Sequence, residues 1–188
     1  MAILIISVLS VLLMSGVQSA TASSRNAGCV SNLRALNLAV HTYAHDHNDC
    51  FPAGYGTETG TGTANSWGHW ARDYIKSYPS YRIKEIGITF CPTTKTGGEG
   101  IYTRNATQWL TDYNVNRFVF SAIESNNRRS LMPGSRIMMF DGQGGVSGSA
   151  TTSNQRLRHR ERFNVVFVDG SVQSLPSFAG FDKRWQEN

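Results

Sequence analysis

The sequence predicts an α+β fold in which one long N-terminal helix precedes a small antiparallel sheet. Three observations favour this class. Residues 1–24 carry no charged side chain, and residues 1–17 are mostly apolar. Apolar residues then recur at helical spacing as far as Tyr43, and two strand-like runs flank Asp169-Gly170. A chain of 188 residues is long enough for one domain with its own hydrophobic core, and its 40% hydrophobic content excludes a disordered protein.

The N-terminal helix is expected to span residues 1–47, with its first half embedded in a membrane. A helix of about 17 residues is about 25 Å long, close to the roughly 30 Å of a bilayer's hydrocarbon core. There are two alternatives to a membrane anchor: the segment is a secretory signal peptide cleaved after Ala22, or it is the lower part of a longer apolar helix. The side chains predicted to anchor the chain in lipid are Ile3, Leu4, Ile5, Ile6, Val8, Leu9, Val11, Leu12 and Leu13.

The second half of this helix is expected to lie against a globular head formed by residues 48–188. The apolar positions follow one another at steps of four, three, four and three, which places them in one stripe on a helix. Asn48-Asp49 and Phe51-Pro52 end the pattern. The stripe consists of Cys29, Leu33, Leu36, Val40 and Tyr43.

The head is expected to contain short elements separated by loops. Residues 52–64 are rich in Gly and Thr and predict a loop, and the aromatic spacing after Trp67 predicts a short helix that Pro79 closes. Short strands are predicted within residues 86–91, 112–120 and 136–140, and a Gly/Ser/Thr loop over residues 141–153.

The clearest local prediction is a β-hairpin within residues 162–176. Asp169-Gly170 suits a two-residue type I′ turn, in which both turn residues need a positive φ. That register would pair Val168 with Ser171 and would place Phe163, Val165 and Phe167 on one face.

The histidines and aspartates suggest chemistry that we do not favour. His41 and His45 share a helix face at a spacing that zinc could use, but surface histidines are the simpler interpretation, so no metal is expected. Loop oxygens near Asp141-Gly142 could hold calcium, although the EF-hand spacing is absent. His159 and Asp169 would lie about 33 Å apart along an extended strand, so they are expected to serve structure rather than catalysis.

The three cysteines leave one unpaired in any disulfide scheme. Cys29 and Cys50 would lie about 30 Å apart on the helix, too far for a bond. A disulfide of Cys91 with Cys50 or Cys29 is therefore the prediction, and three free thiols are the alternative.

A basic strip alternates along residues 156–162. On a strand its arginines would line one face, either as a charged edge that prevents strand pairing or as a site for phosphate or acidic polysaccharide. The strip consists of Arg156, Arg158, Arg160 and Arg162.

Five short motifs, in order, resemble a known family. The chain resembles bacterial prepilin-like proteins related to type II secretion pseudopilins, in the planctomycete-type subgroup with a C-terminal H-X9-DG signature. His159, nine residues and Asp169-Gly170 match that signature. The basic leader and processing site of the family are not in this sequence, so Met1 is expected to lie several residues inside the apolar helix. The other matching segments are Cys29-Val30-Ser31-Asn32-Leu33-Arg34, Tyr43-Ala44 with Phe51-Pro52, Phe90-Cys91-Pro92 and Tyr113-Asn114-Val115-Asn116.

The resemblance implies a pilin-like fold and a structural role without catalysis. Such a subunit would cross the bacterial inner membrane once and hold its head in the periplasm or on the cell surface. Its partners would be the inner membrane and other pilin-like subunits or secretion machinery, with no nucleic acid. Two alternatives remain: a glycan-binding module that uses Trp67, Trp70 and Trp109, and a metal-dependent hydrolase built on His41 and His45.

Overall fold

The computed structural model describes residues 2–52, 88–94, 112–116, 118–120, 128–142, 145–147 and 155–177. The helix predicted after Trp67 lies outside these residues, as does Trp109. In the described part of the chain, one 45-residue helix, α1 (Ala2–Asp46), precedes a five-stranded sheet. The fold class is therefore α+β and pilin-like, as predicted.

The sheet has the strand order β3-β1-β2-β4-β5. Strands β1 (Tyr113–Asn116), β2 (Ile137–Asp141), β4 (Phe163–Phe167) and β5 (Val172–Leu175) pair antiparallel in that spatial order. The short strand β3 (Gly145–Ser147) lies within the predicted loop over residues 141–153 and pairs in parallel with β1. A short 3₁₀ helix, η2 (Arg129–Leu131), precedes β2.

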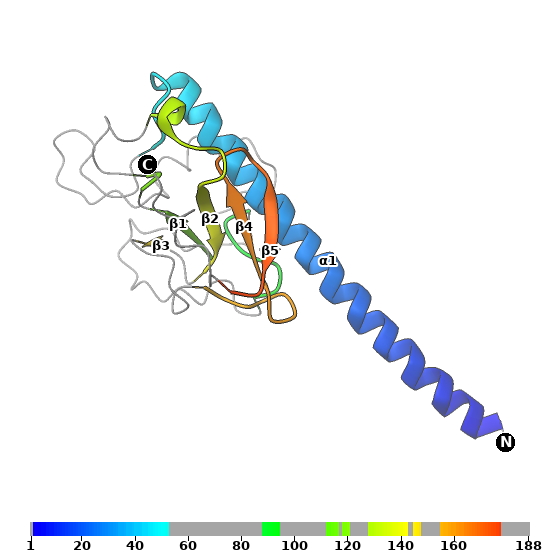
Figure 1. Cartoon of the computed structure of the whole chain (residues 1–188). Coiled ribbons are helices and arrows are strands. Elements are labelled where there is room, and N and C mark those ends of the chain that lie inside the picture. The colour runs from blue at the N-terminus through cyan, green and yellow to red at the C-terminus, as the bar shows by residue number, and fades with distance from the viewer. Residues whose placement is uncertain are drawn as a thin grey trace, which may run out of the picture.

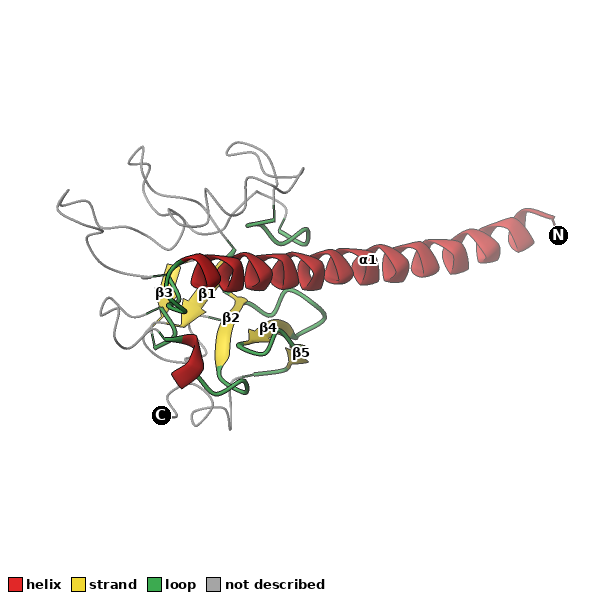
Figure 2. Cartoon of the chain, turned by 90° about the horizontal axis from the view of Figure 1, so that it is seen from above, coloured by secondary structure: helices red, strands yellow, loops and turns green. Residues whose placement is uncertain are grey.

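Helix α1 lies along one face of the sheet with its second half, while its N-terminal half projects away from the head (Figures 1 and 2). The predicted stripe forms that contact, because Cys29, Leu33, Leu36 and Val40 are completely buried and Tyr43 packs against them. The helix ends where Asn48 and Asp49 adopt φ values of 53° and 63°, and the Asp49 amide donates to the Ala44 carbonyl at 2.8 Å.

Along the projecting part, large apolar side chains are more than half exposed. They are Ile3, Ile5, Ile6, Leu9, Leu13, Met14 and Val17. The side chains of Leu4, Val8, Val11 and Leu12 lie outside the described set. Among the described residues, no helix meets the length and apolarity that a candidate membrane span requires.

Both faces of the sheet carry apolar clusters. Val166 and Val168 face α1, whereas Phe163, Val165 and Phe167 lie in a second cluster with Ile137 and Phe140. This alternation confirms the predicted shared face of those three residues. A bulge between Ile137 and Met139 shifts the register of β2, which explains why Met138 and Met139 both join the cluster beneath α1.

The hairpin of β4 and β5 forms, but its predicted register and turn are wrong. Val166 pairs with Val172, and the Gly170 amide donates to the Phe167 carbonyl at 2.9 Å, so the loop has three residues. Among the three residues of this loop, only Gly170 has a positive φ, at 84°. The Val168 amide instead donates to the Arg136 carbonyl and the Asp169 amide to the Gly134 carbonyl. These bonds to the segment before β2 explain the longer loop.

Two other sequence predictions are corrected. Residues 88–90, within the segment predicted as a strand, form a turn and a bend, and Cys91 is not in a strand either. Residues 156–162 form a chain reversal rather than a strand, because Arg160 and Glu161 adopt φ values of 54° and 61°. The arginines of the basic strip therefore do not share one strand face.

Candidate metal centre

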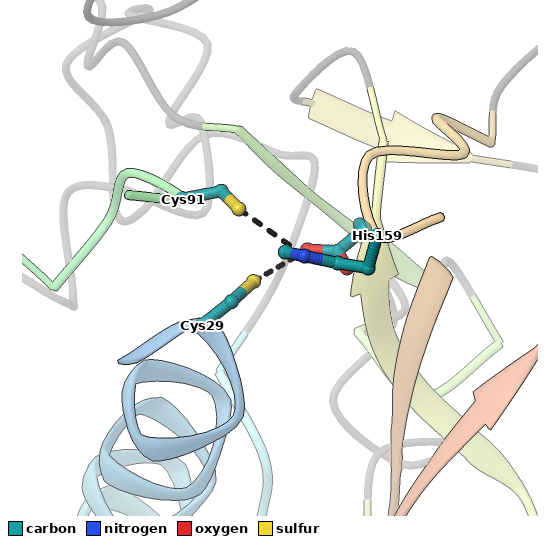
Figure 3. A group of neighbouring side chains, drawn as sticks. Cys29, Cys91 and His159 are labelled. Atoms are coloured by element: carbon teal, nitrogen blue, oxygen red, sulfur yellow. Dashed lines mark hydrogen bonds and ion pairs between the residues drawn. The ribbon is translucent and has the colours of Figure 1, made fainter. Parts of the chain in front are cut away.

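Four buried side chains from four distant segments meet between α1 and the sheet. Cys29 comes from α1, Cys91 from the turn over residues 88–94, Asp141 from the end of β2, and His159 from the reversal before β4. Their sulfur, nitrogen and oxygen atoms all lie within 4.8 Å of one another. Figure 3 shows both thiols directed toward the space beside the His159 ring. We call this group the Cys29 cluster.

The contacts within the Cys29 cluster are short. The Cys29 Sγ atom donates to Asp141 Oδ1 at 2.9 Å, and Cys91 Sγ lies 3.4 Å from His159 Nε2. The same His159 nitrogen lies 3.2 Å from Asp141 Oδ2. Cys29, Cys91 and Asp141 are 0% exposed and His159 is 7% exposed, so solvent barely reaches the group.

A surrounding layer orients three of these four side chains. The Tyr113 hydroxyl lies 3.3 Å from Cys29 Sγ, and the Thr93 hydroxyl lies 3.3 Å from His159 Nδ1. The backbone amide of Asn164 donates to Asp141 Oδ2 at 2.8 Å. The second nitrogen of the histidine and the second oxygen of the carboxylate are therefore engaged as well.

A buried ion pair supports the same region. The Asp112 carboxylate accepts the Cys91 backbone amide at 3.0 Å, and it accepts the Arg158 guanidinium at 3.3 Å. Arg158 also donates to the Gly142 carbonyl at 2.8 Å. This member of the basic strip thus holds the turn of Cys91 and the segment of His159 together, and it does not form a surface for anions.

The surroundings shift the pKa values of the two thiols in opposite directions. A hydrogen bond from Cys29 lowers the pKa of Cys91 to about 5. Burial opposes this shift, and a hydrogen bond with His159 adds to it. Burial and the neighbouring Cys91 and Asp141 raise the pKa of Cys29. Burial disfavours the imidazolium of His159, but hydrogen bonds to Asp141 and Cys91 outweigh it and raise the pKa to about 9. The Cys91 thiolate therefore pairs with the His159 imidazolium at neutral pH.

Two thiols, an imidazole and a carboxylate are ligand types of a transition metal such as zinc. Calcium prefers an all-oxygen environment, but the described partners of the Asp141 carboxylate are a thiol, an imidazole and a backbone amide. The sequence analysis considered Asp141 only as part of a calcium site, and the donors that surround its carboxylate do not suit calcium.

The other sequence candidates lie elsewhere. His41 Nε2 contacts the Val168 carbonyl at 2.8 Å, and His45 contacts Asp46; within the described residues, neither belongs to a cluster of metal donors. His159 lies in the Cys29 cluster, while Asp169 lies in the β4–β5 turn and accepts the Ser171 amide. The three cysteines are free thiols, and Cys91 lies beside Cys29.

The sequence predicted no cluster of Cys29, Cys91, Asp141 and His159. Cys29, Cys91 and His159 belong to the motifs that carry the family resemblance. That membership was the signal in the sequence that could have pointed to the site. The convergence of the four residues depends on how α1, β2 and two turns pack together, and no spacing along the chain reports that.

The model of a family described as "Protein of unknown function (DUF1559)" matches residues 18–79, which include the second half of α1. No curated protein and no solved structure matches the chain. Over this N-terminal third, the chain is thus similar to that family.

Proposed function

We propose that this protein is a non-enzymatic structural subunit resembling a type II secretion pseudopilin. The first half of α1 would anchor it in the bacterial inner membrane, and the head would lie in the periplasm or on the cell surface. The observation that carries the proposal is the exposed apolar surface of the projecting half of α1.

Seven large apolar side chains on that half are more than 50% exposed. Burying each such side chain is worth about 1.5–3 kcal/mol, so leaving the whole set in water is strongly unfavourable. A bilayer would bury them, and an α-helix satisfies its backbone groups within lipid. Ser10 supports this environment, because its hydroxyl already donates to the Ile6 carbonyl at 2.8 Å.

The same surface would serve assembly with other pilin-like subunits. Apolar helices extracted from the membrane can pack against one another, while the head remains attached through the stripe of α1. The similarity of residues 18–79 to one family and the five motifs support this assignment. The reactive side chains of the Cys29 cluster are buried, which favours a structural role for the head.

Membrane fractionation tests the anchor. We expect the full chain to remain in the membrane pellet after alkaline carbonate washing. A double variant, Ile6→Arg with Leu13→Arg, should move to the soluble fraction, because each arginine at the centre of a membrane helix costs about 2.5–3.5 kcal/mol.

Leu38→Arg is the matched control, because Leu38 is an exposed apolar residue of the same helix beside the head. This variant should stay in the pellet. If the unaltered chain is released by carbonate, or if the double variant is retained like the control, the anchor is disproved.

A further inference from the structure

We propose that Cys29, Cys91, Asp141 and His159 bind one zinc ion, which fastens helix α1 to the sheet. This inference stands apart from the proposed membrane role, since it concerns only the interior of the head. It assigns a metal site to four residues, three of which belong to the sequence motifs of the family resemblance.

The geometry of the Cys29 cluster is close to that of a tetrahedral site. Zinc bonds of about 2.0–2.3 Å place neighbouring ligand atoms about 3.3–3.8 Å apart. The cluster has its sulfur-to-nitrogen contact at 3.4 Å and its nitrogen-to-oxygen contact at 3.2 Å. The sulfur of Cys29 lies 2.9 Å from the carboxylate, so it would move outward by less than an ångström on binding (about 0.6 Å).

The donor set selects zinc among the common divalent ions. Two thiolates and a carboxylate carry three negative charges, of which a divalent ion neutralises two. Magnesium and calcium prefer oxygen ligands, whereas thiolate with imidazole is the usual choice of zinc. Binding would displace the proton of the Cys29 thiol and one proton of the His159 imidazolium. Four protein ligands and almost no exposure describe a closed structural site rather than a catalytic one.

The surrounding contacts are those that a bound ligand set needs. A metal-ligating histidine commonly engages its other ring nitrogen, and here Thr93 lies 3.3 Å from His159 Nδ1. Tyr113 can donate its hydroxyl to the Cys29 sulfur, and the Asn164 amide donates to Asp141 Oδ2, the carboxylate oxygen beside His159. Three of the four ligands are therefore oriented before a metal arrives.

Metal analysis of the full chain, purified in detergent under reducing conditions, tests the site. We expect one equivalent of zinc for each chain. Cys29→Ser, Cys91→Ser and His159→Ala should each lose it. Cys50→Ser is the matched control: Cys50 is half-buried, lies outside the cluster and should leave the zinc content unchanged.

Two further measurements cover variants that fail to fold. The unaltered chain, freed of zinc by a chelator, should take up Co²⁺ and show the intense visible bands of tetrahedral coordination with a thiolate charge-transfer band. Tyr113→Phe keeps the buried ring and removes only the hydroxyl, so it should weaken zinc affinity about tenfold without unfolding the head.

The proposal is overturned if the folded, reduced chain contains no zinc and gives no tetrahedral Co²⁺ spectrum. A Cys29–Cys91 disulfide in the protein isolated from its native compartment, seen as a linked peptide by mass spectrometry, would also overturn it. Neither result would bear on carbonate extraction, so failure of the metal site and failure of the anchor are distinguishable.

Discussion

At the scale of single residues, the turn that carries His159 is strained. The His159 amide donates to the Arg162 carbonyl at 3.0 Å, and the Arg162 amide donates back at 3.2 Å. Arg160 and Glu161, between them, both have positive φ values. Two consecutive left-handed residues are the pattern of a type I′ turn, which usually contains Asn or Gly. Here charged residues occupy it, and each pays about 1–2 kcal/mol in backbone energy.

Glu161→Gly is therefore expected to stabilise the protein. Relief of the left-handed strain exceeds the added freedom that glycine gives the unfolded chain, which leaves about 0.5–1 kcal/mol. The midpoint of urea unfolding measures this. Glu161→Ala removes the same exposed side chain without relieving the backbone, so it should not raise the midpoint; a rise equal to that of glycine would refute the strain argument.

The sequence predicted a type I′ turn at the wrong position. Asp-Gly suggested the type I′ geometry at residues 169–170, whereas the structure has it at residues 160–161. The hairpin was nevertheless predictable from the alternation of β4 residues. Its register was not, because it depends on hydrogen bonds from Val168 and Asp169 to Arg136 and Gly134, which lie more than 30 positions earlier.

At the scale of elements, α1 is one continuous helix whose two halves differ: large apolar side chains are exposed on the first half, and the second half has one buried stripe. Its second half follows a 4-3-4-3 stripe, of which four residues are completely buried and Tyr43 is half-buried. The stripe did not include Asn37, Ala39 and Ala44, which are buried as well. The end of α1 was predictable too, because Asn48 and Asp49 tolerate the left-handed conformation that stops a helix. Asn37 strengthens the contact with a bond to the Phe167 carbonyl at 3.1 Å.

The stripe makes a quantitative prediction about two leucines of α1. Leu36 is completely buried against the sheet, whereas Leu38 is 59% exposed. Leu36→Ala should lower the free energy of unfolding by about 2–5 kcal/mol, because it leaves a cavity in the core.

Leu38→Ala should change this free energy by no more than about 0.5 kcal/mol. Chemical denaturation of both variants, followed by circular dichroism, provides the comparison. Equal effects would contradict the docking of α1 that we describe.

At the scale of the whole molecule, the head and the projecting half of α1 meet near Ser19. Arg160 donates to the Ser19 hydroxyl at 2.6 Å, and before that position the described large apolar side chains of α1 are exposed. The Cys29 cluster, by contrast, needs the complete head. This dependence on global packing explains why sequence analysis identified its residues separately but did not bring them together.

A chain that begins at residue 18 is therefore expected to retain the fold of the head. It should stay in solution without detergent and unfold cooperatively within a few degrees of the full chain, because the removed residues make no described contact with the sheet. Differential scanning calorimetry measures the transition. Aggregation of this shortened chain would indicate that residues 1–17 pack within the head instead.

The separation of the ligands along the chain also has a consequence during biosynthesis. Cys29 precedes His159, the last of the four ligands, by 130 residues. At about 5–20 residues per second, a ribosome needs roughly 6.5–26 s to reach the histidine after making the cysteine. During that interval the Cys29 thiol has no finished pocket to shelter it, and Cys50 is the first other thiol to emerge. Correct maturation then requires that the nascent thiols stay reduced until the last partner has been synthesised.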